Sequence, residues 1–406
     1  MITRQYPQPL RGLEPDSWAR TTIVERLPEI VNRILRENQF PGRIELDLEL
    51  LRNELPDQKI RPIQDLHAPD FSDWRGYTAN YLDQNWLEVP WFFAENYFYR
   101  RVMEAVRFFE LGEDPFQNQK EIGYQKSSPA IDQYSAKLAE WLDPNQAPEE
   151  YLQDALYLTL WGNQADYSLW PADGDSSPEH EDPESAREHI LADDSSRLVQ
   201  LLAGGDGLDR VDFMLDNAGF ELITDLGLAD LILSNGRADR VVLHAKAHPT
   251  FVSDVIPRDV EYAVRVLEDD PSDAVRGFGR RLRKHFQKSR MVVRADFFWN
   301  SPLAMWDLPQ GLKENLSGAD LLISKGDANY RRLTGDRRWE FTTPFSEVID
   351  YLPVTLAAFR TLKAELAVGL SPEAVRKARR SDPEWMTDGR WGVVQYAPSV
   401  QTDGGQ

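Results

Sequence analysis

The chain has 406 residues, with 46 Lys or Arg and 67 Asp or Glu, so its formal net charge is -21. A surface of this charge repels phosphate backbones, which argues against non-specific binding to nucleic acid or to an anionic membrane. The absence of cysteine excludes disulfides, thiolate zinc sites and a cysteine nucleophile, and it fits a reducing compartment.

The N-terminal stretch MITRQYPQPLRGLEPDSW has no apolar segment of the kind that signal peptides carry. No run of about 18 apolar residues, which a membrane-spanning helix would need, occurs in the chain. We therefore expect a cytoplasmic protein. The length is sufficient for one large domain or two domains of ordinary size.

Residues 1 to about 170 show apolar spacings of three and four, broken by Pro and Gly, and lack the alternation of strands. This pattern predicts helices over Thr21 to Asn38, 91–112, Ser135 to Leu142 and Glu149 to Leu160. The acidic stretch 171–188 contains three prolines, which indicates a solvated loop. We interpret residues 1–196 as a mainly helical N-terminal domain.

From about residue 197, short apolar runs alternate with helical patterns. The runs predict strands over 211–215, 240–246, 291–299 and 319–326, and the segments between and after them predict helices over 219–234, 257–268, 273–289, 309–316 and 345–368. Near-continuous apolar strands that alternate with helices are typical of a parallel sheet covered on both faces. We therefore expect residues 197–406 to form a three-layer α/β/α core with a mostly parallel sheet.

Polar side chains follow each of the four predicted strands. They are, in chain order, Asp216-Asn217, Ser253-Asp254, Trp299-Asn300 and the stretch from Lys325 to Asn329. One such pair has a simple explanation as a helix N-cap, but ligands of open α/β sheets bind beyond the carboxyl ends of the strands. Oxygen ligands suit Mg²⁺, Mn²⁺ or a similar ion, and a lysine beside a helix N-terminus suits a phosphate. The combination predicts metal-assisted phosphoryl transfer or hydrolysis.

Several better-known motifs are absent from the sequence. No GxGxxG follows a strand, and no GxxxxGK[ST] occurs, so dinucleotide binding and a P-loop have no support. A nucleophile of the haloacid dehalogenase type would need a second Asp two residues after Asp216, where this chain has Ala218. The Gly-rich stretch 203–207 precedes a strand and is interpreted as a turn.

The helical half also carries polar residues that could belong to a site. Glu95, Asn96 and Arg100 lie in a very apolar helical segment, and Asn163 and Asp166 follow a glycine. One interpretation is that these are satisfied buried groups or parts of an exposed helix face. The other is that the helical domain covers the strand edge and contributes substrate contacts.

Five ordered segments resemble one known family. They are PWFFAENYFYRRV, LWGNQADYSL, DNAGFELITDLGLADLIL, HAKAHPTFVSDV and KGDANYRRLTGD, and the similarity extends from about residue 15 to RTLKAELAVGL and the tail WMTDGRWGVVQY. They resemble the DUF89 family, in the branch of the acidic residue methyltransferase 1-like proteins, which are also called damage-control phosphatases. The resemblance implies a helical N-terminal domain on an α/β/α core. It also implies a phosphatase for small phosphorylated metabolites such as fructose 1-phosphate or fructose 6-phosphate, supported by Mn²⁺, Co²⁺, Ni²⁺ or Mg²⁺.

The resemblance also implies roles for individual residues. Asp216, Asn217 and Asp254 would be the metal ligands, Lys325 would hold the phosphate, and Glu95, Asn163, Asp166, Asn217 and Asn329 would bind the substrate. Asp327 or Glu95 is expected as general base. The nucleophile is either a metal-activated water or a carboxylate, with Asp254 and Asp216 as the candidates. Phe220 departs from many relatives, which have a polar residue there.

Two other functions remain open at this point. The first is an S-adenosylmethionine-dependent protein carboxyl methyltransferase, although no Gly-rich loop follows a strand to hold that cofactor. The second is a non-catalytic metal-binding or regulatory protein in which the polar strand ends are helix caps. Oligomeric state is not predicted.

Overall fold

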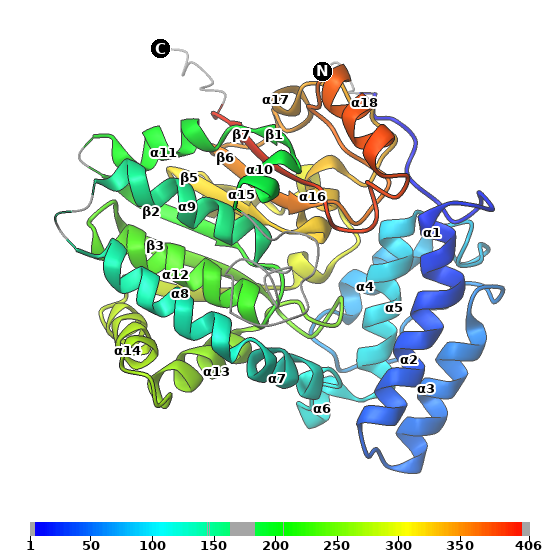
Figure 1. Ribbon diagram of the computed structural model, residues 1–406. Helices are drawn as coiled ribbons and strands as arrows, with labels where there is room; N and C mark the ends of the chain where they lie inside the picture. Colours follow the sequence, from blue (N-terminus) through cyan, green and yellow to red (C-terminus); the bar gives the residue numbers. More distant parts are fainter. Residues whose placement is uncertain (1–4, 144, 146, 163–182, 206, 400–406) are drawn as a thin grey trace.

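A seven-stranded sheet forms the centre of the molecule in the computed structural model, which describes residues 5–143, 145, 147–162, 183–205 and 207–399 (Figure 1). The strands are β1 (Ile190–Asp193), β2 (Leu208–Met214), β3 (Ala238–Lys246), β4 (Met291–Asp296), β5 (Leu321–Lys325), β6 (Leu356–Thr361) and β7 (Gly392–Ala397). Their order across the sheet is β1-β7-β6-β5-β2-β3-β4. Neighbouring strands are parallel except β6 and β7, which are antiparallel. The predicted mostly parallel sheet is confirmed.

Helices cover both faces of the sheet, because successive strand residues belong to two separate cores. In β5, for example, Leu321 and Ile323 enter one core and Leu322 enters the other. The first core is completed by α8 (Ser128–Trp141), α9 (Pro148–Trp161), α10 (Pro183–Glu188), α11 (Ser195–Ala203), α12 (Phe220–Ser234), α13 (Pro257–Glu268) and α14 (Asp273–Gln287). The second is completed by α15 (Gln310–Leu316), α16 (Asp327–Thr334), α17 (Phe345–Val348) and α18 (Pro372–Ser381). The predicted three-layer arrangement is confirmed.

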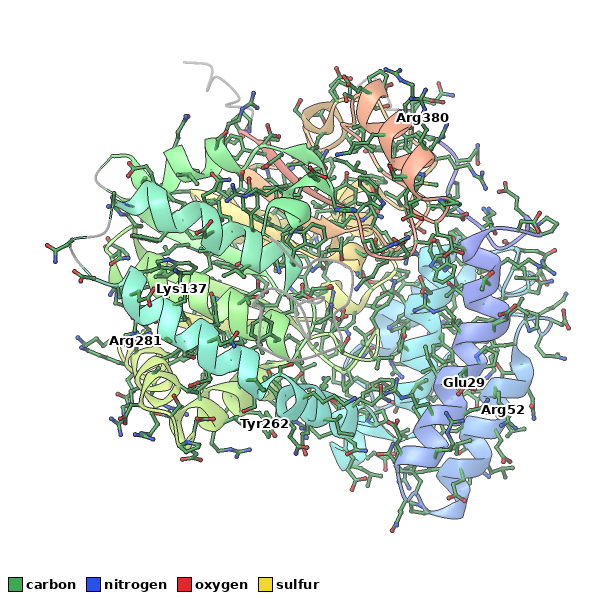
Figure 2. The ribbon with its side chains drawn as sticks, viewed as in Figure 1. Glu29, Arg52, Lys137, Tyr262, Arg281 and Arg380 are labelled. Carbon is green, nitrogen blue, oxygen red and sulfur yellow. The ribbon has the colours of Figure 1, made fainter. Side chains whose placement is uncertain are left out.

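The N-terminal helices stand beside the sheet and share its second core (Figure 1). They are α1 (Trp18–Thr21), a π-helical turn η1 (Thr22–Arg26), α2 (Leu27–Glu37), α3 (Gly42–Glu54), α4 (Phe71–Ala79), α5 (Trp91–Ala105) and α6 (Phe108–Leu111). The next helix, α7 (Gln117–Lys126), contributes Tyr124 to the first core instead. Arg52 of α3 donates a hydrogen bond to Asn32 of α2 at 2.8 Å, and Figure 2 labels Arg52 on α3 and Glu29 on α2. The predicted helical N-terminal region is confirmed.

The sheet layer draws on residues from both sides of the predicted boundary at residue 196. The helices α8 and α9 pack against α11, α12 and α14, and β1 lies before the boundary. The boundary between two domains therefore stays a prediction.

Some predicted elements are wrong. The closing helix over 345–368 is instead the short α17 followed by β6, whose six residues are all buried. A short apolar run of this kind has the same pattern in a buried strand as in a buried helix. The strand over 291–299 stops at Asp296, whose side chain accepts from the Phe298 N–H at 2.8 Å and starts a 3₁₀ turn. The strands β1 and β7 are not predicted.

Two further predictions differ in detail. The helix over 91–112 is interrupted at Arg107, which has φ 55°, and so becomes α5 and α6. In the acidic stretch, residues 183–188 form α10 instead of a loop, with Pro183 at its first turn, where proline is favoured. Residues 171–182 lie outside the described part of the chain.

The order of the strands places a switch point between β5 and β2. From β2 the chain proceeds outward to β3 and β4, and it then returns to the other side of β2 with β5. The loops after β2 and β5 therefore lead away on opposite faces, which leaves a crevice at their carboxyl ends, where such sheets bind ligands. Of the helices that the structure describes, none has the length and apolar character required to cross a membrane.

Candidate active site

A pocket of about 670 Å³ lies at this switch point, between the sheet edge and the N-terminal helices. Its sheet side includes Asp216, Asn217, Glu221, Phe251, Val252, Ser253, Asp254, Gly326, Asp327, Ala328, Phe359, Thr361 and Lys363. Its helical side includes Glu25, Arg26, Glu29, Ile30, Arg33, Trp91, Glu95 and Tyr99. The helical layer thus closes the strand edge, as expected if it contributes substrate contacts.

Backbone hydrogen bonds tie together the segments that carry Asp216, Asn217 and Asp254. The Val255 N–H donates to the Asp216 carbonyl at 2.7 Å, and Asn217 and Asp254 form an isolated antiparallel bridge. The segment after β3 therefore folds back along the end of β2. Two acidic residues that are 38 positions apart in the sequence meet in this way at one edge, as the strand-end pattern predicts.

The Asn217 carboxamide connects the side chains of this cluster. Its Nδ2 donates to Asp216 Oδ2 at 2.8 Å and to Glu221 Oε2 at 2.9 Å, while its Oδ1 accepts from the Ser253 hydroxyl at 2.5 Å. Glu221, in the first turn of α12, is a member of the cluster that the sequence did not reveal. Its position in the first turn of the helix that follows β2, four residues after Asn217, is the signal that could have identified it.

Burial changes the titration of this cluster. Burial raises the pKa of Asp216 well above its ordinary value, and the negative charges of Asp254 and Glu221 raise it further. Burial also raises the pKa of Asp254 to about 6, although the nearby Lys246 ammonium, 3.3 Å from Asp254 Oδ2, partly offsets this effect. Two buried carboxylates thus share one edge of the sheet, an arrangement that favours a cation between them.

We expect Mn²⁺ affinity to rise as the pH is raised through about 6, because Asp254 must lose its proton to bind a cation. The folded pKa of Asp254 lies above the unfolded value of about 3.9. Its protonation therefore stabilises the metal-free fold, and that stabilisation is lost as the pH rises through about 6. Calorimetric titration across pH measures the affinity, and urea unfolding of wild type against Asp254→Asn measures the stability difference. If neither the Mn²⁺ affinity nor the stability difference changes with pH, Asp254 is not a metal ligand with a raised pKa.

The N-terminus of α16 comes directly against the carboxylate cluster. Gly326, with φ 81°, precedes it, and a side chain there would overlap the Asp216 carboxylate. Asp327 Oδ1 accepts from Arg360 Nε at 2.8 Å and from the Lys363 N–H at 3.1 Å. The close approach therefore requires glycine, and it brings the free N–H groups of the first helical turn to the pocket.

Glu95 reaches the pocket from α5. Its Oε2 accepts from Arg331 Nη1 at 2.6 Å, and Arg331 also pairs with Asp336 at 2.7 Å and stacks 3.7 Å from the centre of the Trp91 ring. Burial raises the pKa of Glu95, although Arg331 opposes this shift. Arg331 is a second pocket residue that sequence reasoning missed.

Lys325 and Asn329 do not line the pocket. The Lys325 ammonium is buried and pairs with Asp225 at 2.8 Å and with Glu221 at 3.1 Å. Asn329 donates to the Leu215 and Lys325 carbonyls and accepts from Lys246 at 3.2 Å. Both side chains therefore support the cluster from behind, and their predicted contact with substrate stays a prediction.

Lys363 is a cation of the pocket that lies near Asp216. It follows β6, lies close enough to Asp216 to lower the pKa of that carboxyl group, and its ammonium has no hydrogen-bond or ion-pair partner among the described residues. The helix predicted over 345–368 conceals this lysine, because the helical pattern places no strand end before it. A strand assignment for β6 would have made Lys363 a fifth polar strand end.

Other predicted residues have structural roles or lie outside the described part of the chain. Arg100 pairs with Asp70 at 2.8 Å in the protein interior, and Asn96 donates to the Phe92 carbonyl. Asn300 accepts from the Ala247 N–H at 2.7 Å. The positions of Asn163 and Asp166 are not described. Among the described residues, no group of three or more His, Asp or Glu is arranged to hold a metal ion.

Comparison with known proteins gives one consistent result. Residues 22–378 match the model of the damage-control phosphatase ARMT1-like domain. The chain is 34% identical to damage-control phosphatase ARMT1 of Xenopus tropicalis, with 95% of this chain and 97% of that protein covered. It is 31% identical to the Homo sapiens protein of the same name, with 96% and 98% covered.

A solved structure of a DUF89 family protein from Pyrococcus horikoshii is 14% identical, with a TM-score of 0.47, and the match covers 91% of this chain and 96% of that one. The family model spans most of the chain, and the curated relatives match it along nearly their whole length. The family expected from the five sequence segments is thereby confirmed, and the chain belongs to the ARMT1-like damage-control phosphatases of the DUF89 family.

Proposed function

We propose that this member of the family hydrolyses small phosphorylated metabolites with the help of a divalent metal ion, and that sugar phosphates such as fructose 1-phosphate or fructose 6-phosphate are its substrates. The observation that carries the proposal is the buried pair Asp216 and Asp254, joined through Asn217 at the switch point, with Lys363 beside it. Clustered acids next to a lysine suit a metal ion and an anionic substrate together.

The donor set fits a hard divalent ion. Asp254 Oδ2 is buried and lacks a hydrogen bond of good geometry among the described residues, with only the Lys246 ammonium 3.3 Å away. Asp216, Asn217 and Asp254 would hold the ion, and their oxygen atoms suit Mg²⁺ or Mn²⁺ better than a soft metal. When bound, such an ion would polarise the phosphoryl oxygens and offset the negative charge of the transition state.

The phosphoryl group would lie between Lys363 and the first turn of α16. Lys363 supplies an ammonium that has no ion-pair partner among the described residues, and the N–H groups that follow Gly326 supply donors at the positive end of a helix. Arg331 is less available, because Glu95 and Asp336 already occupy its guanidinium. The sugar would extend toward α2 and α5, where Ile30, Trp91 and Tyr99 provide apolar surface beside charged groups.

Glu95 is our choice of general base. Its pKa is raised by burial, so the carboxylate takes up a proton closer to neutral pH than an exposed one would. Asp327 is the alternative, but its Oδ1 is held by Arg360 and by the backbone of Lys363. A water molecule is the preferred nucleophile, because the proposed ligand roles of Asp216 and Asp254 occupy the two carboxylates that could otherwise attack.

A phosphatase screen tests the proposal. Purified protein, stripped with a chelator, is supplied with Mn²⁺, Co²⁺, Ni²⁺ or Mg²⁺ and a panel of sugar phosphates, and released phosphate is measured. We expect phosphate release from fructose 1-phosphate or fructose 6-phosphate that depends on the added ion. Activity that is unaffected by the chelator would refute the metal requirement, and release confined to other phosphomonoesters would refute the sugar phosphate class.

Replacing Lys363 with methionine is expected to reduce kcat/KM for the sugar phosphate by about a hundredfold, since one preorganised group aimed at the developing charge is worth about that much. The fold should be unaffected, because the ammonium makes no ion pair within the described residues. Lys313→Met, an exposed lysine on α15, is the matched control and should keep wild-type activity. If the Lys363→Met variant keeps wild-type activity, Lys363 does not bind the phosphoryl group.

A further inference from the structure

The backbone just before Asp254 is strained. Phe251 and Val252 have φ values of 46° and 68°, a region that residues with a side chain rarely adopt. The Ser253 N–H donates to the Phe251 carbonyl at 2.8 Å, which closes a three-residue turn around Val252. A turn of this kind with positive φ at its centre is a rare and strained form, and a β-branched residue is the least suited to occupy it.

The strained turn lies directly before Asp254 in the chain and beside Asn217, two of the proposed metal ligands. Ser253, the last residue of the turn, donates through its hydroxyl to Asn217 Oδ1 at 2.5 Å, and its carbonyl accepts from the Ala218 N–H at 2.7 Å. Asp254 follows directly, with its N–H bonded to the Thr250 carbonyl at 3.2 Å. A relaxed backbone at Val252 would therefore shift both Ser253 and Asp254 relative to Asn217.

The helical layer supplies contacts that hold the turn. The Phe251 ring lies 5.1 Å from the ring of Tyr99 and 6.4 Å from that of Phe92, measured between centroids. Both partners are on α5, and Tyr99 also lines the pocket. Strained conformations persist when the surrounding structure determines them strongly, and they are concentrated at functional sites.

We propose that the turn at Phe251 and Val252 is a positioning device, through which α5 holds Asp254 and Ser253 in the geometry that binds the metal ion. Phe251 and Val252 are positioning residues in this role, because they act through Ser253 and Asp254. The inference rests on the proposed metal-dependent function. It adds that the helical layer, in addition to closing the pocket, determines the affinity of the site for its ion.

Val252→Gly is the decisive variant, because glycine adopts positive φ without strain. Relief of the strain, typically about 1–3 kcal/mol per strained residue, should offset the extra freedom that glycine gives the unfolded chain, so the metal-free protein should melt no lower than wild type. We expect the variant to bind Mn²⁺ about tenfold more weakly in calorimetry, as is common when groups that orient a ligand are changed. Its kcat/KM should fall by a similar factor at limiting Mn²⁺ and recover in part at saturating Mn²⁺.

Ser289→Gly is the matched control. Ser289 has φ 54° in the exposed turn between α14 and β4, so the same backbone relief occurs away from the pocket. It should show wild-type Mn²⁺ affinity. For the contact with α5, Phe251→Ala should weaken Mn²⁺ binding and Phe251→Tyr should restore it.

The outcomes separate the two proposals. If wild type binds Mn²⁺ and Val252→Gly binds it equally well, the positioning role is refuted while the metal-dependent function stands. If wild type binds no divalent ion and has no ion-dependent activity, the proposed function is refuted and the positioning role with it. Weaker Mn²⁺ binding by a Val252→Gly protein that melts no lower than wild type supports the inference, because a merely structural role would leave the affinity unchanged.

Discussion

The Asp254→Asn variant is expected to lose at least about a thousandfold in kcat, because it would no longer bind the metal ion. A bound ion stabilises the transition state by several kcal/mol, and each 1.4 kcal/mol of that stabilisation corresponds to about a factor of ten in rate. Asparagine keeps the volume of the side chain but removes the negative charge that the ion requires. The Mn²⁺-dependent rise in melting temperature should disappear with the activity, since a ligand that binds the folded state stabilises it.

Loss of activity through unfolding is the main alternative to exclude in that experiment. Lys246 lies 3.3 Å from Asp254 Oδ2 and would lose its buried carboxylate partner, but it would keep Asn329 Oδ1 at 3.2 Å. Asp239→Asn, an exposed carboxylate at the start of β3, is the matched control and should behave as wild type. A folded Asp254→Asn protein that hydrolyses sugar phosphates at the wild-type rate would refute the metal site.

The parts of the site that the sequence predicts are those that depend on strand ends. Asp216, Asn217 and Asp254 follow strands with clear apolar runs, and parallel topology then brings them to one edge without any knowledge of side-chain packing. The same reasoning missed Lys363, because the apolar run of β6 is equally compatible with a helix. An error in one secondary structure element therefore removed one site residue.

The ion-pair partners of Lys325 could not be predicted either, but for a different reason. Asp225 and Glu221 lie one turn apart on α12, whose residues are all buried except Ser234 at its end. A helix that is apolar around its whole circumference gives no sign of which side its few polar residues face. Only the packed structure shows that Asp225 and Glu221 face the lysine, where burial raises the pKa of Asp225 to about 7 against the effect of Lys325.

Backbone conformation is the third property that the sequence did not provide. Val252 is β-branched, and its residue type favours extended structure, yet the structure holds it at positive φ. The cause is tertiary: the aromatic contacts of Phe251 with α5 and the bridge between Asn217 and Asp254 fix both ends of the turn. Local preference and packing disagree here, as they do most often at functional sites.

Gly326→Ala is expected to lower activity by about a hundredfold or more, because a displacement of about 1 Å in a catalytic group has effects of that size. The added methyl group would overlap the Asp216 carboxylate, so Asp216 or the start of α16 must move. Either movement would separate the proposed metal ligands from the N–H groups that are proposed to hold the phosphate. Kinetics with saturating Mn²⁺ measure the loss of activity, and the melting temperature measures the loss of stability.

A second glycine separates this overlap from the cost of the backbone conformation. Gly236 has φ 64° in the turn between α12 and β3, and a side chain there would meet no atom within 4 Å. Gly236→Ala should lose about 1 kcal/mol of stability because of its positive φ. Gly326→Ala should lose more, because φ 81° and ψ 176° lie in a region that is essentially restricted to glycine, but only Gly236→Ala should retain full activity. Equal activity in the two variants would mean that Asp216 can move without consequence, and it would then contradict the role of Asp216 as a ligand whose position matters.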